Sequence, residues 1–397
     1  MRKIFEVYIA KADAPAENET FAELSLPAMP YGLFDAMDKA RIGEGGELYF
    51  EIENYDAFEF LAPLLSEQGN LLELNALAQK LSELDDRQST SFEGLVIVEI
   101  QKEEGPIPMP RLIDLAHSAD CCYVVDEALN AAQLCRFYAK NGFVPEVESL
   151  PENIFKLLDF EAIGREARQA EGGVFTEHGY VVQHTELTLA FQNKNMTLRT
   201  PDYQILLGIP ADGIQDPSRD SVCTDILSLP GYQAIYGTRI KELAVTASEQ
   251  RRLRCLDCRI PGLAGAVENA GLQEINSFAE LLQGMGDKQM LAYKAILDAV
   301  GCASLDAAVT LAGHLDEFVL SPHINSAREL AVEQLRFMMS DEDAQLLAKH
   351  TDLHGYGKEI LDCGCAAISP YGMVERSGHQ PLHTPLEQPE QGGMEMK

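Results

Sequence analysis

The sequence repeats itself, and this duplication limits how the chain can fold more than any other feature. Residues 72–78 read Leu-Glu-Leu-Asn-Ala-Leu-Ala, and residues 273–279, 201 positions later, read Gln-Glu-Ile-Asn-Ser-Phe-Ala. Both segments place apolar side chains at i, i+3, i+4 and i+7, which is the pattern of an amphipathic helix with one buried face. A pattern that returns in this way indicates two copies of one structural unit.

Three further matches occur in the same order along the chain. They pair residues 24–27 with 227–230, 164–166 with 357–359, and 179–181 with 372–374. We therefore predict a tandem duplication with small drifts in spacing. Its predicted divisions are a first repeat at 1–184, a linker at 185–196, a second repeat at 197–376 and a tail at 377–397. The tail has no apolar periodicity, so we expect it to be disordered.

Within the first repeat, alternating side chains predict strands at Phe5–Ile9 and Leu48–Glu53. Periodicity and punctuating glycines and prolines predict helices near 33–42, 71–81, 86–98, 109–116, 126–138 and 160–170, and a short strand after the glycine pair at 172–173. The expected class is α+β, with small helix-plus-sheet modules near 1–68, 69–106 and 107–184. The second repeat follows the same plan with weaker strand signals.

The charge is strongly acidic, with 63 Asp and Glu against 31 Lys and Arg, a net of −32. Residues 1–184 hold 34 acidic and 14 basic side chains, so most of the excess lies in the first repeat. Nucleic acid is itself an anion and is an improbable ligand. Duplex DNA carries one phosphate per roughly 1.7 Å, so this net charge matches about 54 Å of duplex. An acidic surface that only maintains solubility would give the same composition.

The remaining composition favours a cytoplasmic protein without a metal. No apolar stretch is long enough to cross a bilayer, and the first residues turn acidic before any apolar run forms. The nine cysteines lack framework spacing and are expected to be reduced thiols. Four of them could offer thiolates to zinc, although the Cys-x-Cys spacing is poorly suited to supply the second pair of ligands. These four are Cys255, Cys258, Cys363 and Cys365. The basic run at 251–254 either pairs with acidic residues or is solvated.

One long segment carries a resemblance to a known family. Phe160, Glu161, Gly164 and Arg165, followed by residues 171–180, closely resemble the end of ArdA-type antirestriction proteins. Residues 73–86, 6–10 and 47–55 are similar to that family's middle helices, opening strand and acidic aromatic strand. The resemblance thus spans nearly all of the first repeat.

That resemblance implies an elongated acidic α+β protein of three small modules, usually dimeric, that imitates bent B-form DNA. Such proteins occupy the DNA-binding groove of type I restriction-modification enzymes and protect incoming mobile DNA. They use carboxylates in place of phosphates and have neither a catalytic residue nor a cofactor. A tandem pair would act as a single-chain pseudo-dimer. Residues 11–17 depart from the family's Asn-Gly-rich loop, and the second repeat has lost acidic residues.

The resemblance and the clustering of charge together give the candidate contacts with the partner. They are Asp85, Asp86, Asp126, Glu127, Glu146, Glu148, Glu152, Asp159, Glu161, Glu166, Glu171 and Glu177. Three alternatives stay open: an interaction adaptor that uses apolar grooves, an enzyme with a site at Glu177 and His178, and a mimic aimed at a CRISPR effector or nucleoid protein. No Gly-rich phosphate loop or nucleophile set supports the enzyme.

Overall fold

The computed structural model describes most of the chain. The described residues are 2–12, 20–43, 46–65, 69–102, 105–143, 154, 157–191, 196–210, 223–231 and 253–383. They form two compact units. The first compact unit contains Met1–Tyr8, Ser25–Ala28 and Phe50–Leu198, and the second contains Ile9–Leu24, Met29–Tyr49 and Arg199–Lys397. The units interleave along the first 49 residues, so they are not the same division as the two repeats, whose boundaries stay a prediction.

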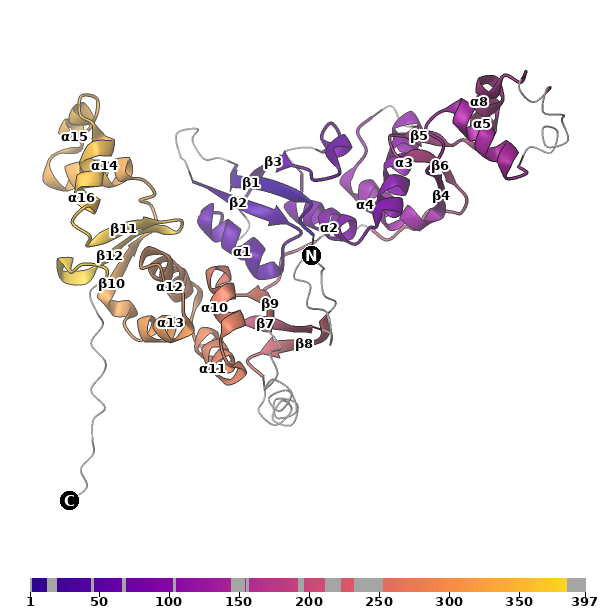
Figure 1. The fold of residues 1–397 in the computed structure, drawn as a ribbon. Coiled ribbons are helices and arrows are strands. Elements are labelled where there is room, and N and C mark those ends of the chain that lie inside the picture. The colour runs from indigo at the N-terminus through magenta and orange to yellow at the C-terminus, as the bar shows by residue number, and fades with distance from the viewer. Residues whose placement is uncertain are drawn as a thin grey trace. The chain divides into compact units, whose positions relative to one another are not determined.

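The described residues form a mixed α+β chain of small modules, as the sequence predicted. Four three-stranded sheets have the strand orders β2-β1-β3, β4-β6-β5, β8-β7-β9 and β10-β12-β11 (Figure 1). The strands are β1 (Phe5–Lys11), β2 (Phe21–Leu26), β3 (Leu48–Asn54), β4 (Cys122–Val125), β5 (Val174–Thr176), β6 (Gly179–Gln183), β7 (Ile205–Pro210), β8 (Cys223–Leu229), β9 (Arg254–Cys258), β10 (Phe318–Ser321), β11 (Ala366–Ser369) and β12 (Gly372–Arg376).

The longer helices of the first half agree with the sequence periodicity to within a few residues. They are α1 (Pro30–Lys39), α2 (Leu71–Ser82), α3 (Asp86–Lys102), α4 (Met109–His117), α5 (Ala131–Lys140) and α8 (Phe160–Glu171). The helix expected from residue 126 begins five residues later. The Asn130 side chain accepts the Gln133 amide at 3.0 Å and fixes the start of α5 there. Residues 126–130 form a turn that the apolar pattern does not distinguish from helix.

The order of elements recurs in the second half of the chain. Its helices are α10 (Ala264–Asn269), α11 (Leu272–Gln283), α12 (Asp287–Ala299), α13 (Leu305–Ala312), α14 (Ala327–Met338), α15 (Asp341–Ala348) and α16 (Leu353–Leu361). Short 3₁₀ helices η1 (Glu59–Leu61) and η3 (Pro261–Leu263) follow the third strand of each half. By sequence order, α2, α3, α4, α5 and α8 correspond to α11, α12, α13, α14 and α16. The strand orders of the sheets correspond as well.

The two halves also share hydrogen bonds that depend on particular residues. The Asn75 side chain accepts the Ala28 amide at 2.8 Å, and the Asn276 side chain accepts the Gly231 amide at 3.0 Å. Asn276 lies 201 residues after Asn75, the offset found in the sequence. In both halves this asparagine ties a helix to the residue that follows the Leu-Pro pair. The duplication therefore extends from the sequence to the packing of individual side chains.

A close helix contact is repeated in the same way. A Cβ atom on Gly164 of α8 would lie 1.8 Å from the Ala131 carbonyl oxygen of α5. A Cβ atom on Gly357 of α16 would lie 1.8 Å from the corresponding oxygen of Ala327 on α14. Each helix pair can approach this closely only because glycine has no side chain. Figure 1 shows α5 beside α8 and α14 beside α16.

The folded chain continues past the predicted start of the tail. Residues 377–379 form a 3₁₀ turn, Leu382 is buried, and its amide donates to the Gly364 carbonyl oxygen at 2.9 Å. The apolar pattern missed this contact because a single buried leucine has no periodicity. Residues 384–397 lie outside the described residues. No helix in the described part of the chain is long and apolar enough to cross a membrane.

Candidate protein-binding surface

Nine of the twelve candidate carboxylates lie among the described residues, and all nine are exposed. They are Asp85, Asp86, Asp126, Glu127, Asp159, Glu161, Glu166, Glu171 and Glu177. The other three, Glu146, Glu148 and Glu152, lie outside the described residues. Exposure keeps these nine side chains in contact with water, where a partner could reach them.

Three of the nine also hold the fold together. Asp85 accepts the Gln88 amide at the start of α3 at 2.8 Å, and Asp159 accepts the Ala162 amide at the start of α8 at 3.0 Å. Glu171 accepts the hydroxyl groups of Tyr138 and Tyr180 at 2.7 and 2.9 Å. Burial and the bond to Glu171 raise the pKa of both tyrosines. These three side chains therefore contribute to the stability of the fold, whether or not they also contact a partner.

The three glutamates of α8 do not share one face of the helix. Glu161, Glu166 and Glu171 are five residues apart, and five residues of an α-helix correspond to a rotation of about 140°. Glu161 also forms an exposed ion pair with Arg165 at 3.8 Å, the kind of contact that contributes little. The helix thus distributes its charge around its axis.

A tighter group of carboxylates surrounds one end of the β4-β6-β5 sheet, and we call it the sheet-end cluster: Glu93, Asp126, Glu127 and Glu177. Gly179, the first residue of β6 after the β5–β6 turn, has a φ of +153°. A Cβ atom there would lie 2.8 Å from the Val125 carbonyl oxygen and 3.1 Å from Asp126 Cα. The β5–β6 turn, which carries Glu177, therefore lies directly against the residues that follow β4.

Glu93 completes the cluster from α3. Its neighbour Gly94 has no side chain, and a Cβ atom there would lie 2.5 Å from Val181 of β6, so α3 lies close to the sheet. Glu93 is half-buried. Burial raises the pKa of its carboxyl group, His178 opposes that rise, and Glu177 adds to it. Burial and the neighbouring Glu177 therefore disfavour the charged form of Glu93.

Sequence reasoning missed Glu93 because it stands among buried residues of an amphipathic helix. A signal was nevertheless present. At the offset of 201 residues, Glu93 aligns with Lys294, so the charge is reversed between the two repeats. Such a reversal at a half-buried position marks a place where the repeats face different surroundings.

The turn that carries Glu177 and His178 has the same backbone structure in both halves. The His178 amide donates to Thr176 Oγ1 at 3.1 Å. The corresponding Tyr371 amide donates to Ser369 Oγ at 3.2 Å. The shared turn needs neither an acid nor a histidine, since the second repeat has Pro370 and Tyr371 in these positions. The acid–base pair of Glu177 and His178 stays a hypothesis from the sequence.

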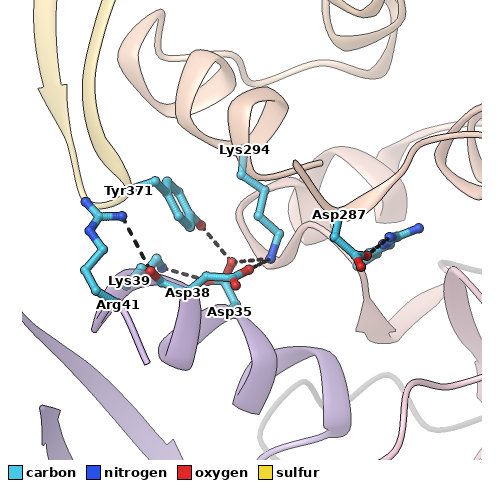
Figure 2. A network of polar contacts seen from close by, with 8 residues as sticks. Asp35, Asp38, Lys39, Arg41, Asp287, Lys294 and Tyr371 are labelled. Atoms are coloured by element: carbon cyan, nitrogen blue, oxygen red, sulfur yellow. Dashed lines mark hydrogen bonds and ion pairs between the residues drawn. The ribbon is translucent and has the colours of Figure 1, made fainter. Parts of the chain in front are cut away.

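In the second compact unit, the corresponding position is a buried ion-pair network (Figure 2). Lys294 of α12 is 3% exposed, and its Nζ lies 2.9 Å from Asp35 Oδ1 and 3.0 Å from Asp38 Oδ2 of α1. Asp35 is 5% exposed and also pairs with Lys39 at 2.8 Å. The Tyr371 hydroxyl donates to Asp35 Oδ1 at 2.7 Å. Two lysines and a hydroxyl therefore surround one buried carboxylate.

These contacts set the ionisation of the two acids. Burial alone would raise the pKa of Asp35, but Lys294 and Lys39 outweigh it and hold that pKa below its usual value. Burial and the adjacent Asp35 raise the pKa of the Tyr371 hydroxyl. Asp35 is therefore a charged carboxylate at neutral pH, and Tyr371 is a neutral donor.

Further hydrogen bonds hold the first turn of α1 in place within the second compact unit. The Tyr31 amide donates to Asp257 Oδ2 at 3.3 Å, and the Tyr203 hydroxyl donates to the same oxygen at 2.8 Å. The Tyr31 hydroxyl donates to the Tyr203 carbonyl oxygen. A carboxylate at a helix N-terminus also interacts favourably with the helix dipole. The helix is thus held at both ends of its buried face.

The thiols considered for zinc lie in two places of the second compact unit. Cys255 and Cys258 lie on β9, whereas Cys363 and Cys365 lie between α16 and β11, and all four are free. In the described part of the chain, no three His, Cys, Asp or Glu side chains converge in a way that could hold a metal ion. Of the basic run at 251–254, Arg251 and Arg252 lie outside the described residues.

No family model matches the chain, and no curated protein sequence matches it significantly.

Proposed function

We propose that this chain is an antirestriction protein of the ArdA type, a DNA mimic that occupies the DNA-binding groove of a type I restriction-modification enzyme. It acts in the cytoplasm, without a cofactor and without catalysing a reaction. The observation that carries the proposal is the sheet-end cluster of the first repeat. There, acidic side chains gather at an exposed edge where the second repeat has neutral or basic ones.

The chemistry of this cluster suits a surface made for DNA-binding proteins. Glu127 and Glu177 are exposed carboxylates, and Glu93 is half-buried with a raised pKa. A lysine or arginine of a partner would relieve the repulsion between these groups and form charge-assisted hydrogen bonds. DNA-binding grooves contain such cations to hold phosphates. The cluster is therefore complementary to a phosphate-binding groove.

The side chains of the second repeat support different roles for the two repeats. Where the first repeat has Glu93, Asp126, Glu127 and Glu177, the second has Lys294, Pro322, His323 and Pro370. Lys294 is used inside the second compact unit, where Asp35 and Asp38 neutralise it. We therefore assign target binding to the first repeat and a scaffold role to the second.

The deciding experiment measures DNA binding by a purified type I restriction-modification complex at increasing concentrations of this protein, at low and at moderate salt. We expect competitive loss of DNA binding, weaker at the higher salt because the contacts are ionic. A variant with Asp126→Asn, Glu127→Gln and Glu177→Gln should inhibit at least tenfold less well.

The matched control removes three exposed carboxylates from the second repeat, with Glu342→Gln, Glu359→Gln and Asp362→Asn. Both variants lose the same charge, so only the location differs. Equal loss from the two would indicate a non-specific charge effect and contradict the assignment. If the unmodified protein does not inhibit, that enzyme is not the target, and a CRISPR effector or nucleoid protein would be assayed next.

A further inference from the structure

Two cysteines of the second compact unit lie close together at the end of a helix. Cys363 and Cys365 follow α16 and precede β11, with only Gly364 between them. Gly364 has a φ of +74°, a left-handed conformation that glycine adopts without strain. Two residues that flank one residue of a helical turn have Cα atoms about 5.4 Å apart, and a disulfide needs about 4.4–6.8 Å. The backbone therefore places the two cysteines within the range of a disulfide.

The side chains of these cysteines, which we call the thiol pair, also interact. The Cys365 thiol donates to the His379 carbonyl oxygen at 2.9 Å. Partial burial and the adjacent Cys363 thiol raise the pKa of the Cys365 thiol. The Arg376 amide donates to the Cys365 carbonyl oxygen at 3.0 Å, and the Leu382 amide donates to that of Gly364 at 2.9 Å. The two thiols are therefore neighbours on a backbone that further hydrogen bonds hold in place.

Cys363 differs from the other cysteines in its access to solvent. Among the cysteines whose exposure the structure describes, it alone is exposed, and Cys365 is partly buried. Both line a cavity of about 490 Å³, whose wall also includes Ile324, Met373 and His379. Sites for small molecules have volumes of about 300–1,000 Å³. A small reagent therefore meets Cys363 first, and the group that leaves has room beside Cys365.

The first repeat shows that the shared fold does not need these thiols. At the offset of 193 residues, Ala170 and Gly172 stand in place of Cys363 and Cys365. Between them the first repeat has Glu171, which accepts two tyrosine hydroxyl groups. The thiol pair is therefore a feature of the second repeat that its packing does not explain.

We propose that Cys363 and Cys365 form a thiol–disulfide exchange site for low-molecular-weight disulfides of the glutathione class. The Cys363 thiolate attacks one sulfur atom of oxidised glutathione, forms a mixed disulfide and releases one glutathione thiolate. The Cys365 thiolate then attacks the Cys363 sulfur, closes the internal disulfide and releases the second glutathione thiolate. The protons of the two cysteines pass to solvent, and the released thiolates take up protons from it. The thiol pair loses two electrons and the reagent gains them.

This inference is independent of the proposed function, because it concerns the repeat to which we assign no target binding. A second pair of close cysteines provides an internal comparison. Cys255 and Cys258 both lie on β9, but Cys258 is 2% exposed. Thiol exchange requires access to the sulfur atom. Cys258 should therefore stay unmodified as long as the chain is folded.

The test incubates the folded full chain with oxidised glutathione, stops the reaction with acid, alkylates the remaining thiols and analyses tryptic peptides by mass spectrometry. Residues 359–376 form one such peptide, which contains the thiol pair and no other cysteine. We expect this peptide to lose two hydrogen atoms at a rate at least about tenfold above that of any modification at Cys258. Reduced glutathione should be released in the ratio of two molecules to each internal disulfide.

Two variants separate the roles of the thiols, and an unmodified Cys258 in each sample shows that the fold is kept. Cys365→Ser should stop at the mixed disulfide, with one glutathione on Cys363. Cys363→Ser should react at Cys365 at least about tenfold more slowly, because that thiol is partly buried and its pKa is raised. Equal rates in the two variants would overturn the proposal. So would a glutathione that stays on Cys363 of the unmodified chain, or a 359–376 peptide that does not react.

Discussion

Glu93 and Lys294 occupy corresponding positions on α3 and α12, but the protein uses them in opposite ways. Lys294 is buried and neutralised by two carboxylates from α1. Glu93 is half-buried and has an acidic neighbour, and burial raises the pKa of its carboxyl group. One reversal of charge in a duplicated framework thus separates a buried ion pair from a half-buried carboxylate. The comparison shows that one position of a duplicated framework can carry opposite charges while the order of helices and strands stays the same.

The network at Lys294 offers the largest expected effect. In an Asp35→Ala variant, the buried lysine keeps only the half-exposed Asp38, and the Tyr371 hydroxyl loses its acceptor. Removing one partner of a buried ion pair costs about 3–5 kcal/mol. We expect that loss in the free energy of unfolding of the second compact unit, measured by urea denaturation and by hydrogen exchange at α12.

Two controls distinguish the ion pair from simple packing. Asp38→Ala removes the exposed partner and should cost less than about 1 kcal/mol. Combining Asp35→Leu with Lys294→Met replaces the pair by apolar side chains and should restore part of the stability, because the Tyr371 hydroxyl still lacks its acceptor. The double variant could instead lose as much stability as the Asp35→Leu and Lys294→Met variants lose in sum. That result would contradict the role assigned to the ion pair.

The same network predicts acid sensitivity. The pKa of Asp35 is lowered in the folded chain, so its contribution to stability is complete above the usual pKa of 3.8 and is lost as the pH falls below it. The lysines are charged throughout this range. The free energy of unfolding of the unmodified chain should therefore exceed that of the Asp35→Ala variant at neutral pH. This difference should become smaller below pH 3.8.

The glycines of the helix pairs test whether the repeats share their packing. Gly164→Ala and Gly357→Ala each place a Cβ atom 1.8 Å from a backbone oxygen, which cannot move without displacing its helix. Overpacking costs about 1–3 kcal/mol, and a clash with backbone belongs at the upper end. We expect losses of about 3 kcal/mol in both, measured by thermal denaturation followed by circular dichroism. A tolerated change in only one repeat would show that the two helix pairs have diverged.

Much of this fold could be predicted from local sequence patterns, and the reasons are physical. Periodicity located α2 and α3 because each buries one face, and the repeated Asn75 and Asn276 pointed to equivalent helices. The contact between Asp35 and Lys294 could not be predicted, because the residues are far apart in sequence and a buried lysine resembles a surface one. Glu93 was missed for the same reason, since its importance depends on a turn that lies 84 residues later.

The tyrosine pair on Glu171 gives a smaller contrast between the copies. Glu171 accepts two hydroxyl groups, whereas the corresponding Gly364 has no side chain and the residue aligned with Tyr180 is Met373. A Glu171→Ala variant leaves both hydroxyls without this acceptor, which costs about 1–3 kcal/mol. Replacing Tyr138 and Tyr180 by Phe in the same chain should recover part of that loss. Hydrogen exchange at α5 and α8 would measure both changes.

The smallest effect is expected at Glu93 itself, and its sign is opposite to that at Asp35. The folded pKa of Glu93 is raised, so the folded chain holds this proton more tightly, and stability falls as the pH rises above the usual value of 4.5. Glu93→Gln removes that penalty and should stabilise the first compact unit at pH 7 by less than about 1 kcal/mol. The gain should vanish as the pH falls toward 4.5, where the carboxyl group takes up a proton. If Glu93→Gln instead destabilises the module at neutral pH, a cation of the chain already pairs with this carboxylate, and Glu93 does not belong to the proposed binding surface.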